Sequence, residues 1–455
     1  MMPRLQTDSR VHLVGIGGAG MSGLARILLT RGHRVSGSDL RDGRSLEELR
    51  VLGATITVGH RADNLGDAEV VVTSSAVPVN NPELVAARER GRLLLRRAEL
   101  LAELMRDERA VLIAGTHGKT TVTSMAVVGL QAAGGDPSFA IGGSLNESGT
   151  NAHAGTDGTF VAEADESDRS FLVYRPDLAV VTNLEHDHPD EFADLDAVRE
   201  AFLGFLDRRA PGAPALICSD DPGAAWLAGH TDAPVVTFGT DPRAHVRIAG
   251  EGGGHELRIG GESVAPLALA VPGQHNLRNA AAALAVCHEL GADLVAAAGG
   301  LRRFTGAVRR YQRLGVIGGV AVVDDYAHHP TELRATLAAA RSEHPRRIVL
   351  LVQPHRYSRT QVLGAELGRA AAAADVVVVT DVYGSTEAPV PGVTGKLVAD
   401  AAAEAGATVV YRPTLREAVE ELASTVRDGD LVLTTGAGDV TTAGPALLEQ
   451  LGGRR

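Results

Sequence analysis

Short apolar runs alternate with longer amphipathic stretches along the whole chain, and this pattern divides it into three blocks. In the first block, buried strands are predicted at residues 11–16, 34–38 and 70–73, a helix at 21–31, and a charged, leucine-rich helix within 88–109. The spacing of strands and helices in this block is typical of an α/β domain.

The second and third blocks repeat the alternation. In the second we predict strands at 110–114, 159–164 and 178–182, helices at 120–133 and 276–290, and a β-hairpin over the glycine-rich residues 250–261. In the third, which begins near residue 316, we predict strands at 316–323, 347–353, 375–380, 408–410 and 431–434. A chain of 455 residues is expected to form two to four such domains. The fold class predicted is therefore α/β, with parallel, doubly wound sheets.

A glycine loop follows the first predicted strand and opens the first helix. It reads Gly15-Ile-Gly17-Gly-Ala-Gly20, and Asp39 ends the next strand. This is the fingerprint of a dinucleotide site, in which the N–H groups at a helix start hold a pyrophosphate. A UDP-sugar carries the same pyrophosphate and fits equally well. A tight structural turn is the alternative.

A second glycine loop, GTHGKTT at residues 115–121, lies between a predicted strand and a helix. It departs from the generic phosphate loop at Ile113, where that loop has a glycine. The remaining residues of the loop can still bind a nucleotide: Lys119 can reach the β- and γ-phosphates of ATP, and Thr120 can ligate Mg²⁺. Two different phosphate loops imply two phosphorylated ligands, whereas a simple dehydrogenase needs one.

Acidic and histidine residues follow two strands of the second block, as EADESD from Glu163 and NLEHDH from Asn183. Ligands of doubly wound sheets collect at the carboxyl ends of the strands, so these carboxylates can face the ATP loop and hold Mg²⁺. A solvated acidic rim is the alternative.

Composition narrows the class of protein further. The net charge of −12 gives no basic surface for nucleic acid, and no apolar run approaches the length of a membrane span. The two cysteines, Cys218 and Cys287, form no disulfide or metal pattern, which indicates a cytoplasmic protein. Lys119 and Lys396 are the only lysines among 44 cationic residues, which favours a specific role for Lys119.

Taken in order, the motifs of this chain resemble those of the Mur ligases, and in particular the branch that joins L-alanine to UDP-N-acetylmuramate. The matching segments are GIGGAGMSGLA from Gly15, GTHGKTT from Gly115, EADESD from Glu163, NLEHDH from Asn183, PGQHNLRNA from Pro272, GAVRRYQ from Gly306, DDYAHHPTE from Asp324, QPHRYSRT from Gln353 and GAGD from Gly436. Together they cover essentially the whole chain.

The resemblance implies three domains: a Rossmann-like UDP-sugar domain over residues 1–108, a central P-loop-type ATPase domain with a parallel sheet over 109–314, and a Rossmann-like amino-acid domain over 315–455. It implies that ATP converts the carboxylate of UDP-N-acetylmuramate to an acyl phosphate, which the amine of L-alanine then attacks, with two Mg²⁺ ions bound. Neither nucleic acid nor a membrane is an expected partner.

The resemblance also implies residue roles. Catalytic roles fall on Lys119, Glu163, His188, Arg310 and Asp325, and Mg²⁺ ligation on Thr120, Glu163 and His188. ATP contacts fall on Gly115, Thr116, His117, Gly118, Lys119, Thr120, Thr121, His275, Asn276, Asn279, Arg310 and Asp325. UDP-sugar contacts fall on Gly15, Gly17, Gly18, Ala19, Gly20, Met21, Ser22, Asp39, Ser74 and Ser75. The amino acid is expected at Tyr326, His328, His355, Arg356 and Arg359.

Three rival functions remain. A ligase that attaches a whole peptide to the same sugar nucleotide shares the ATP chemistry, but the GAGMSG stretch at Gly18 favours the alanine branch. An NAD-dependent oxidoreductase would use the first glycine loop and leave the second without a role. A non-catalytic nucleotide-binding regulator would not need intact Lys119, Glu163 and His188.

Overall fold

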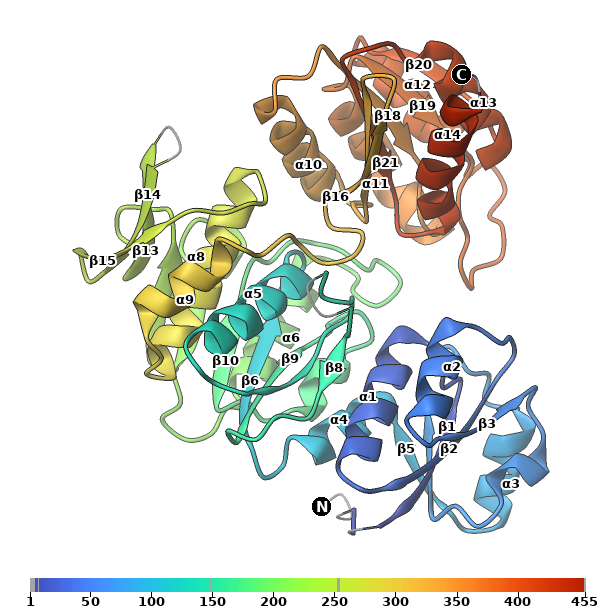
Figure 1. Ribbon diagram of the computed structural model, residues 1–455, viewed down its shortest axis with the longest axis vertical. Helices are drawn as coiled ribbons and strands as arrows, with labels where there is room; N and C mark the ends of the chain where they lie inside the picture. Colours follow the sequence, from blue (N-terminus) through green and yellow to red (C-terminus); the bar gives the residue numbers. More distant parts are fainter. Residues whose placement is uncertain (1–4, 7, 147–148, 252–253, 454–455) are drawn as a thin grey trace. The chain divides into compact units, whose positions relative to one another are not determined.

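A computed structural model describes residues 5–6, 8–146, 149–251 and 254–453 of the chain. It contains three sheets, which follow one another along the sequence (Figure 1). Two compact units can be separated. The first comprises Met1–Leu184, Arg199–Ala268 and Asn279–Arg303, and the second comprises Glu185–Val198, Leu269–Arg278 and Phe304–Arg455. None of the described helices is long and apolar enough to cross a membrane.

The first sheet, in the first unit, is five-stranded and parallel, in the order β3-β2-β1-β4-β5. Its strands are β1 Arg10–Val14, β2 Arg34–Asp39, β3 Thr55–Val58, β4 Val70–Thr73 and β5 Leu93–Arg96, joined by helices α1 Ala19–Thr30, α2 Arg44–Val51 and α3 Pro82–Glu89 and followed by α4 Arg97–Leu104. The chain leaves β1 towards β2 on one side and returns to β4 on the other. Such a switch point opens a ligand crevice at the carboxyl ends of the strands.

The helix predicted within residues 88–109 is confirmed as α4. The sequence did not predict strand β5, which precedes α4 and pairs with β4. Gly91, at a φ of 63°, ends the preceding turn, and the leucines that follow it enter the sheet, where Leu95 is buried. Pairing with β4 outweighs the helix propensity of leucine.

The second sheet, also in the first unit, has ten strands in the order β15-β14-β13-β12-β11-β10-β6-β9-β7-β8. Its strands are β6 Arg109–Ala114, β7 Ser138–Ala140, β8 Ala152–His153, β9 Thr159–Glu163, β10 Leu178–Val181, β11 Ala215–Cys218, β12 Val235–Gly239, β13 Val246–Glu251, β14 Gly254–Ile259 and β15 Glu262–Leu267. The helices are α5 Lys119–Ala132, α6 Leu195–Leu206, α7 Pro222–Ala228, α8 Gln274–Glu289 and α9 Leu294–Leu301. The centre is parallel, and the predicted hairpin at 250–261 is confirmed by the antiparallel β13–β14 pair, with residues 252–253 outside the description.

The third sheet, in the second unit, has the order β16-β17-β21-β18-β19-β20 and is parallel except for the β16 edge. Its strands are β16 Gln312–Ile317, β17 Val320–Asp325, β18 Arg347–Val352, β19 Val376–Val379, β20 Thr408–Tyr411 and β21 Asp430–Thr435. The single strand predicted at 316–323 is wrong: Gly318 and Gly319, at φ values of 61° and 75°, turn the chain between β16 and β17. A two-residue hairpin with positive φ at both positions favours glycine.

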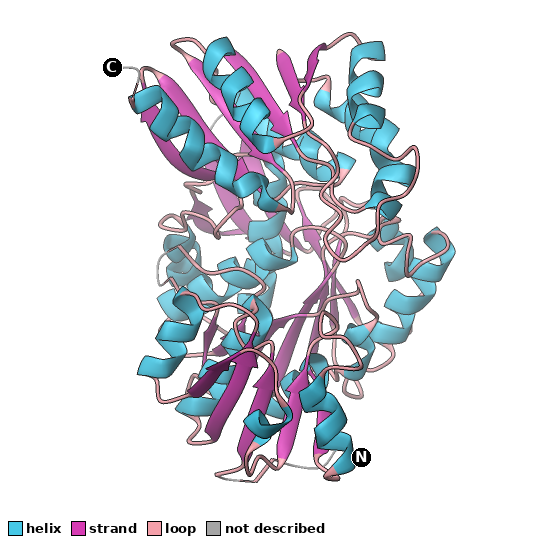
Figure 2. Ribbon diagram, turned by 90° about the vertical axis from the view of Figure 1, so that its right-hand side faces the viewer, coloured by secondary structure: helices cyan, strands magenta, loops and turns pink. Residues whose placement is uncertain are grey.

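Helices cover both faces of the third sheet (Figure 2). Along β18, Ile348 and Leu350 pack with α10 Pro330–Ser342, α11 Tyr357–Ala371 and α12 Lys396–Glu404, whereas Val349 and Leu351 pack with α13 Leu415–Thr425 and α14 Ala443–Gly452. Successive side chains of a strand point to opposite faces, so an uninterrupted apolar run is what a sheet buried on both sides requires.

Candidate functional site

The first glycine loop connects β1 to α1 at the carboxyl edge of the first sheet. The backbone N–H of Gly17 donates to the Asp39 carboxylate at 2.9 Å, which fixes the loop against the end of β2. A Cβ at Gly17 would lie 2.9 Å from the same oxygen, so this position has no room for a side chain. Helix α1 starts without a side-chain cap and without an acidic residue in its first turn, leaving its N–H groups available for an anion.

A cavity of about 940 Å³ lies over this loop. The residues predicted for the UDP-sugar that line it are Gly15, Gly17, Gly18, Ala19, Gly20, Met21, Asp39 and Ser74. Ser22 and Ser75, also predicted, are not among its lining residues. Arg97, Gly142 and Asp165 line the same cavity, so it reaches from the first sheet to the second.

The second glycine loop connects β6 to α5 and is anchored on the end of β10. The N–H of His117 donates to the Asn183 side-chain oxygen at 2.7 Å, and the Thr182 hydroxyl donates to the His117 carbonyl at 2.6 Å. Gly115 and Gly118 have φ values of 136° and 83°, which non-glycine residues rarely adopt. The loop is therefore shaped before any ligand arrives.

Lys119 begins α5, and its ammonium is held inside the loop. It donates to the Gly115 carbonyl at 2.7 Å and to both carboxylate oxygens of Glu166 at 2.9 and 2.7 Å. Burial alone would lower the pKa of Lys119, but the carboxylates of Glu166 and Asp165 outweigh it and raise that pKa. Burial raises the pKa of Glu166 to about 7, with Lys119 opposing the rise. Lys119 thus keeps its charge, while Glu166 is a poorly solvated carboxylate.

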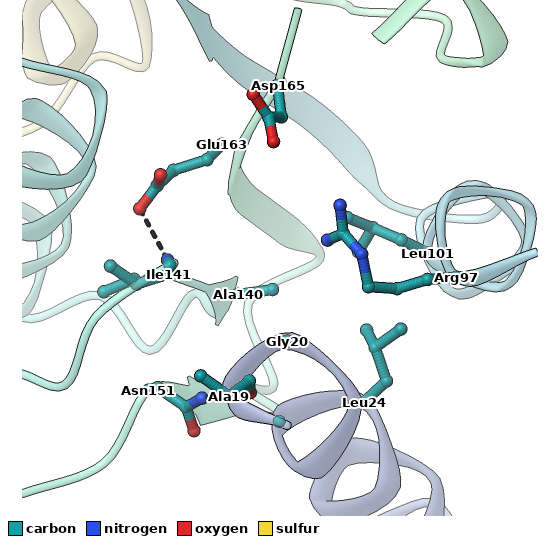
Figure 3. Close-up of a pocket in the computed structure, with 12 residues that line it drawn as sticks. Ala19, Gly20, Leu24, Arg97, Leu101, Ala140, Ile141, Asn151, Glu163 and Asp165 are labelled. Carbon is teal, nitrogen blue, oxygen red and sulfur yellow. Dashed lines mark hydrogen bonds between the residues drawn. The ribbon is translucent and has the colours of Figure 1, made fainter. Parts of the chain in front are cut away.

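Glu163, at the end of β9, lies beside the start of α5. Its carboxylate accepts from the Thr120 hydroxyl at 3.2 Å and from the Gly142 N–H at 2.6 Å, the latter drawn as the dashed line in Figure 3. Figure 3 also shows Asp165 and Arg97 facing the space beside Gly20 of α1. Thr120 and Glu163 form a pair of oxygen donors of the kind that Mg²⁺ prefers.

Asn279, predicted to contact ATP, lies against the second glycine loop. A Cβ at Gly118 would lie 2.8 Å from the Asn279 side-chain oxygen. His275 and Asn276 belong to the second unit, where the Asn276 amide donates to the Pro272 carbonyl at 2.7 Å. Burial and the nearby arginines lower the pKa of His275 to about 4, so this side chain is neutral.

In the second unit, the five residues predicted for the amino acid lie together at the carboxyl edge of the third sheet. His328 lies with its ring centre 5.3 Å from that of Tyr326 and 5.7 Å from that of His355. Arg359 donates to His355 Nδ1 at 3.2 Å. Burial, with neighbouring cationic groups, lowers the pKa of His328 to about 4 and that of His355 to about 3. Both rings are neutral at physiological pH.

The two arginines of this cluster already have carboxylate partners. Arg359 donates two hydrogen bonds to Asp187, at 2.8 and 3.1 Å, and both side chains are only 4% exposed. Despite burial, Arg359 lowers the pKa of Asp187. Arg356, at a φ of 65°, pairs with Asp190 at 2.8 Å and is more accessible. Asp187 also accepts from the N–H of His188, the predicted metal ligand, at 2.7 Å.

Arg310 and Asp325 lie beside this cluster. The Arg310 guanidinium stands 5.0 Å from the Tyr326 ring centre and 3.6 Å from Glu332. Asp325 accepts from the N–H groups of Tyr311 and Ala327 at 2.7 Å each. Burial raises the pKa of Asp325 to about 6, although Arg310 opposes it.

The cavity is also lined by residues that were not predicted, among them Arg97, His60 and Gly142. His60 follows β3 at the carboxyl edge, and this position after a strand could have indicated it. Arg97 sits in a run of arginines and leucines, and no sequence signal separates it from its neighbours. Gly142 is placed by the fold of the second sheet.

Comparisons with known proteins agree with this architecture. Three domain descriptions of one family match in succession: "Mur ligase family, catalytic domain" over residues 10–109, "Mur ligase middle domain" over 113–287, and "Mur ligase, glutamate ligase domain" over 309–438. The chain belongs to the Mur ligase family, and the three-domain α/β fold is confirmed.

Individual relatives are similar over their full length. The UDP-N-acetylmuramate–L-alanine ligase of Saccharopolyspora erythraea is 50% identical, covering 97% of this chain and 93% of its own. The ligase of the same name from Mycolicibacterium smegmatis is 47% identical, covering 99% and 96%. The crystal structure of UDP-N-acetylmuramate–alanine ligase from Thermotoga maritima, 29% identical, superposes with a TM-score of 0.82 over 98% of this chain and 100% of that one.

Proposed function

We propose that this protein joins L-alanine to UDP-N-acetylmuramate at the expense of ATP, giving UDP-N-acetylmuramoyl-L-alanine, ADP and phosphate in peptidoglycan synthesis. The observation that carries the proposal is the cavity that starts at Gly15 of the first glycine loop and reaches Gly142 and Asp165, beside the second loop. A sugar nucleotide held by the first loop can extend its lactyl carboxylate towards a triphosphate held by the second. The names of the full-length relatives support the same substrates.

The first chemical step follows from the charges at the second loop. The lactyl carboxylate attacks the γ-phosphate and ADP leaves, which brings two anions together and needs cations placed in advance. Lys119 supplies one by contacting the β- and γ-phosphates. Thr120 and Glu163 offer oxygen donors that would hold one Mg²⁺, and His188 offers an imidazole for a second. Such ions neutralise phosphate charge when bound.

In the second step the amine of L-alanine attacks the acyl phosphate and phosphate leaves. We assign the amino acid to the cluster of Tyr326, His328, His355 and Arg356. The Arg356 guanidinium is the accessible fork for an α-carboxylate, whereas Arg359 is engaged with Asp187 and orients His355. A pKa of about 3 makes His355 a weak base, so we propose that the alanine ammonium loses its proton to solvent before it attacks.

We place the first domain boundary near residue 108, because the last helix of the first sheet ends at Leu104. The second boundary, expected at residue 314, belongs a few residues earlier, because strand β16 of the third sheet already begins at Gln312. We also propose a cytoplasmic location, where ATP is available and the two buried cysteines, Cys218 and Cys287, stay reduced.

Phosphate release from MgATP and UDP-N-acetylmuramate tests the function, with L-alanine, a tripeptide or no acceptor added in turn. Release that needs both UDP-N-acetylmuramate and L-alanine is the expected result. Release only with the peptide would indicate the peptide-attaching ligase instead. If no reaction releases phosphate and absorbance detects bound nicotinamide, the protein would instead be an oxidoreductase that binds NAD at the first glycine loop.

A further inference from the structure

The guanidinium of Arg97, the first residue of α4, faces the cavity over the first glycine loop. Among the described residues, none forms a hydrogen bond or an ion pair with its guanidinium. The side chain is half-buried, lines the cavity over the first glycine loop, and points towards the space between Gly20 and Asp165 in Figure 3. A half-buried guanidinium without a hydrogen-bonded anion is poorly solvated, which favours a ligand that supplies one.

The guanidinium lies directly against the start of α1. A Cβ built at Gly20 would meet Arg97 Cδ at 3.1 Å and Nη1 at 3.4 Å, so a side chain at this position would press the arginine away from the helix. Gly20 is the second residue of α1, where free backbone N–H groups face an incoming anion. The full charge of Arg97 therefore adds to the partial charge of the helix end.

Asp165 keeps the arginine in this place. It lines the same cavity and faces the same space as the arginine in Figure 3. Its carboxylate attracts the guanidinium from one side, which leaves the side next to Gly20 for a ligand anion.

On the basis of the ligase function proposed above, we propose that Arg97 binds the diphosphate of the UDP-sugar, clamping it against the start of α1. A planar guanidinium can donate two parallel hydrogen bonds to a phosphate, which a lysine ammonium cannot. Arg97 is then the residue that makes the first glycine loop select a diphosphate over an uncharged nucleoside.

The test measures dissociation constants by calorimetry for UDP, UDP-N-acetylglucosamine and UDP-N-acetylmuramate. The first two carry the diphosphate without the lactyl carboxylate. The proteins compared are the wild type, Arg97→Ala, Arg97→Lys and the matched control Arg96→Ala. Arg96 is the preceding residue, with a side chain 67% exposed that reaches Glu99 at 3.4 Å on the surface.

Arg97→Ala is expected to weaken all three ligands equally, by about ten- to a hundredfold, since a charged hydrogen bond to phosphate is lost. Arg97→Lys should fall between the two because it restores charge without the fork, and Arg96→Ala should match the wild type. A loss confined to UDP-N-acetylmuramate would overturn the assignment in favour of the lactyl carboxylate. Unchanged affinities with a lower melting temperature would overturn it in favour of a structural arginine.

The same proteins separate this assignment from the ligase function itself. If the wild type releases no phosphate with UDP-N-acetylmuramate and L-alanine, while Arg97→Ala still weakens UDP and UDP-N-acetylglucosamine together, the ligase proposal fails and the role of Arg97 stands.

Discussion

Binding of ATP is expected to draw a proton into the second glycine loop. In the free protein the ammonium of Lys119 is shared between the Gly115 carbonyl and the carboxylate of Glu166. When the β- and γ-phosphates take Lys119, Glu166 loses its cation and gains anionic neighbours in a site that already disfavours its charge. Its pKa must then rise further, so the carboxyl binds a proton as the nucleotide binds.

The size of the uptake follows from the pKa of about 7 in the free protein. The uptake equals the fraction of Glu166 that is ionised before binding, which is about 0.1 at pH 6, about 0.5 at pH 7 and about 0.9 at pH 8. By linkage, the affinity for ATP should fall about tenfold for each pH unit above 7 through this group. Glu166→Gln is neutral at every pH and should lose that dependence.

Calorimetry in buffers of different ionisation enthalpy measures the uptake. MgATP is titrated without the sugar nucleotide, and the difference between the wild type and Glu166→Gln removes the nucleotide's own protonation. Asp168→Asn, an exposed acid of the same segment, is the control and should behave as the wild type. Equal proton uptake by the wild type and Glu166→Gln at pH 7 and 8 would refute the exchange of partners at Lys119.

Three further substitutions test the scaffold of the sites. Gly115→Ala should abolish ATP binding in a calorimetric titration, because its Cβ would overlap the Thr182 hydroxyl at a φ of 136°; unchanged affinity would show that the loop is not rigid. Asp187→Asn should lower stability by about 3–5 kcal/mol in thermal unfolding, since it leaves the buried guanidinium of Arg359 without its charge partner, whereas replacing both by leucine and methionine should restore most of it. Glu83→Gln should lower stability at pH 7 by up to about 3 kcal/mol, because hydrogen bonds from neighbouring side chains, outweighing burial, bring the pKa of that carboxyl from 4.5 to about 2. A folded pKa below the unfolded value means that this contribution is full above pH 4.5 and declines as the pH falls towards 2, so calorimetric scans of wild type and variant must converge in acid.

Features carried by adjacent residues could be predicted from the sequence. Each glycine loop joins a strand to a helix within a few residues, so the strand, the loop and the helix could all be predicted from one short segment. The five residues expected at the amino acid also lie together, because they follow β17 and β18, whose carboxyl ends lie at the same edge of one sheet on either side of β21. The strands themselves were harder to predict where the apolar pattern runs through a turn, as between β16 and β17.

Partnerships between distant residues could not be predicted. The sequence placed Glu166 in an acidic segment, but its hydrogen bonds to Lys119 depend on β9 lying next to β6 in the sheet. Arg359 fits an α-carboxylate fork by sequence, yet its guanidinium meets Asp187, 172 residues away. A buried charged side chain pairs with an opposite charge that the fold brings near it, and the spacing of residues in the sequence does not predict which residue that partner is.

The role of Arg97 could not be predicted from the sequence either. The preceding residue, Arg96, is also an arginine and ends strand β5 in the same stretch of sequence. Only the turn into α4 directs the Arg96 side chain to solvent and the Arg97 side chain into the cavity. What distinguishes Arg97 is a guanidinium without a hydrogen-bonded partner among the described residues, beside a helix start whose second residue, Gly20, leaves room for it. Both features arise only in the folded chain, so the affinities of Arg97→Ala and Arg96→Ala for UDP measure how much of this site's specificity arises from the fold rather than from the motif.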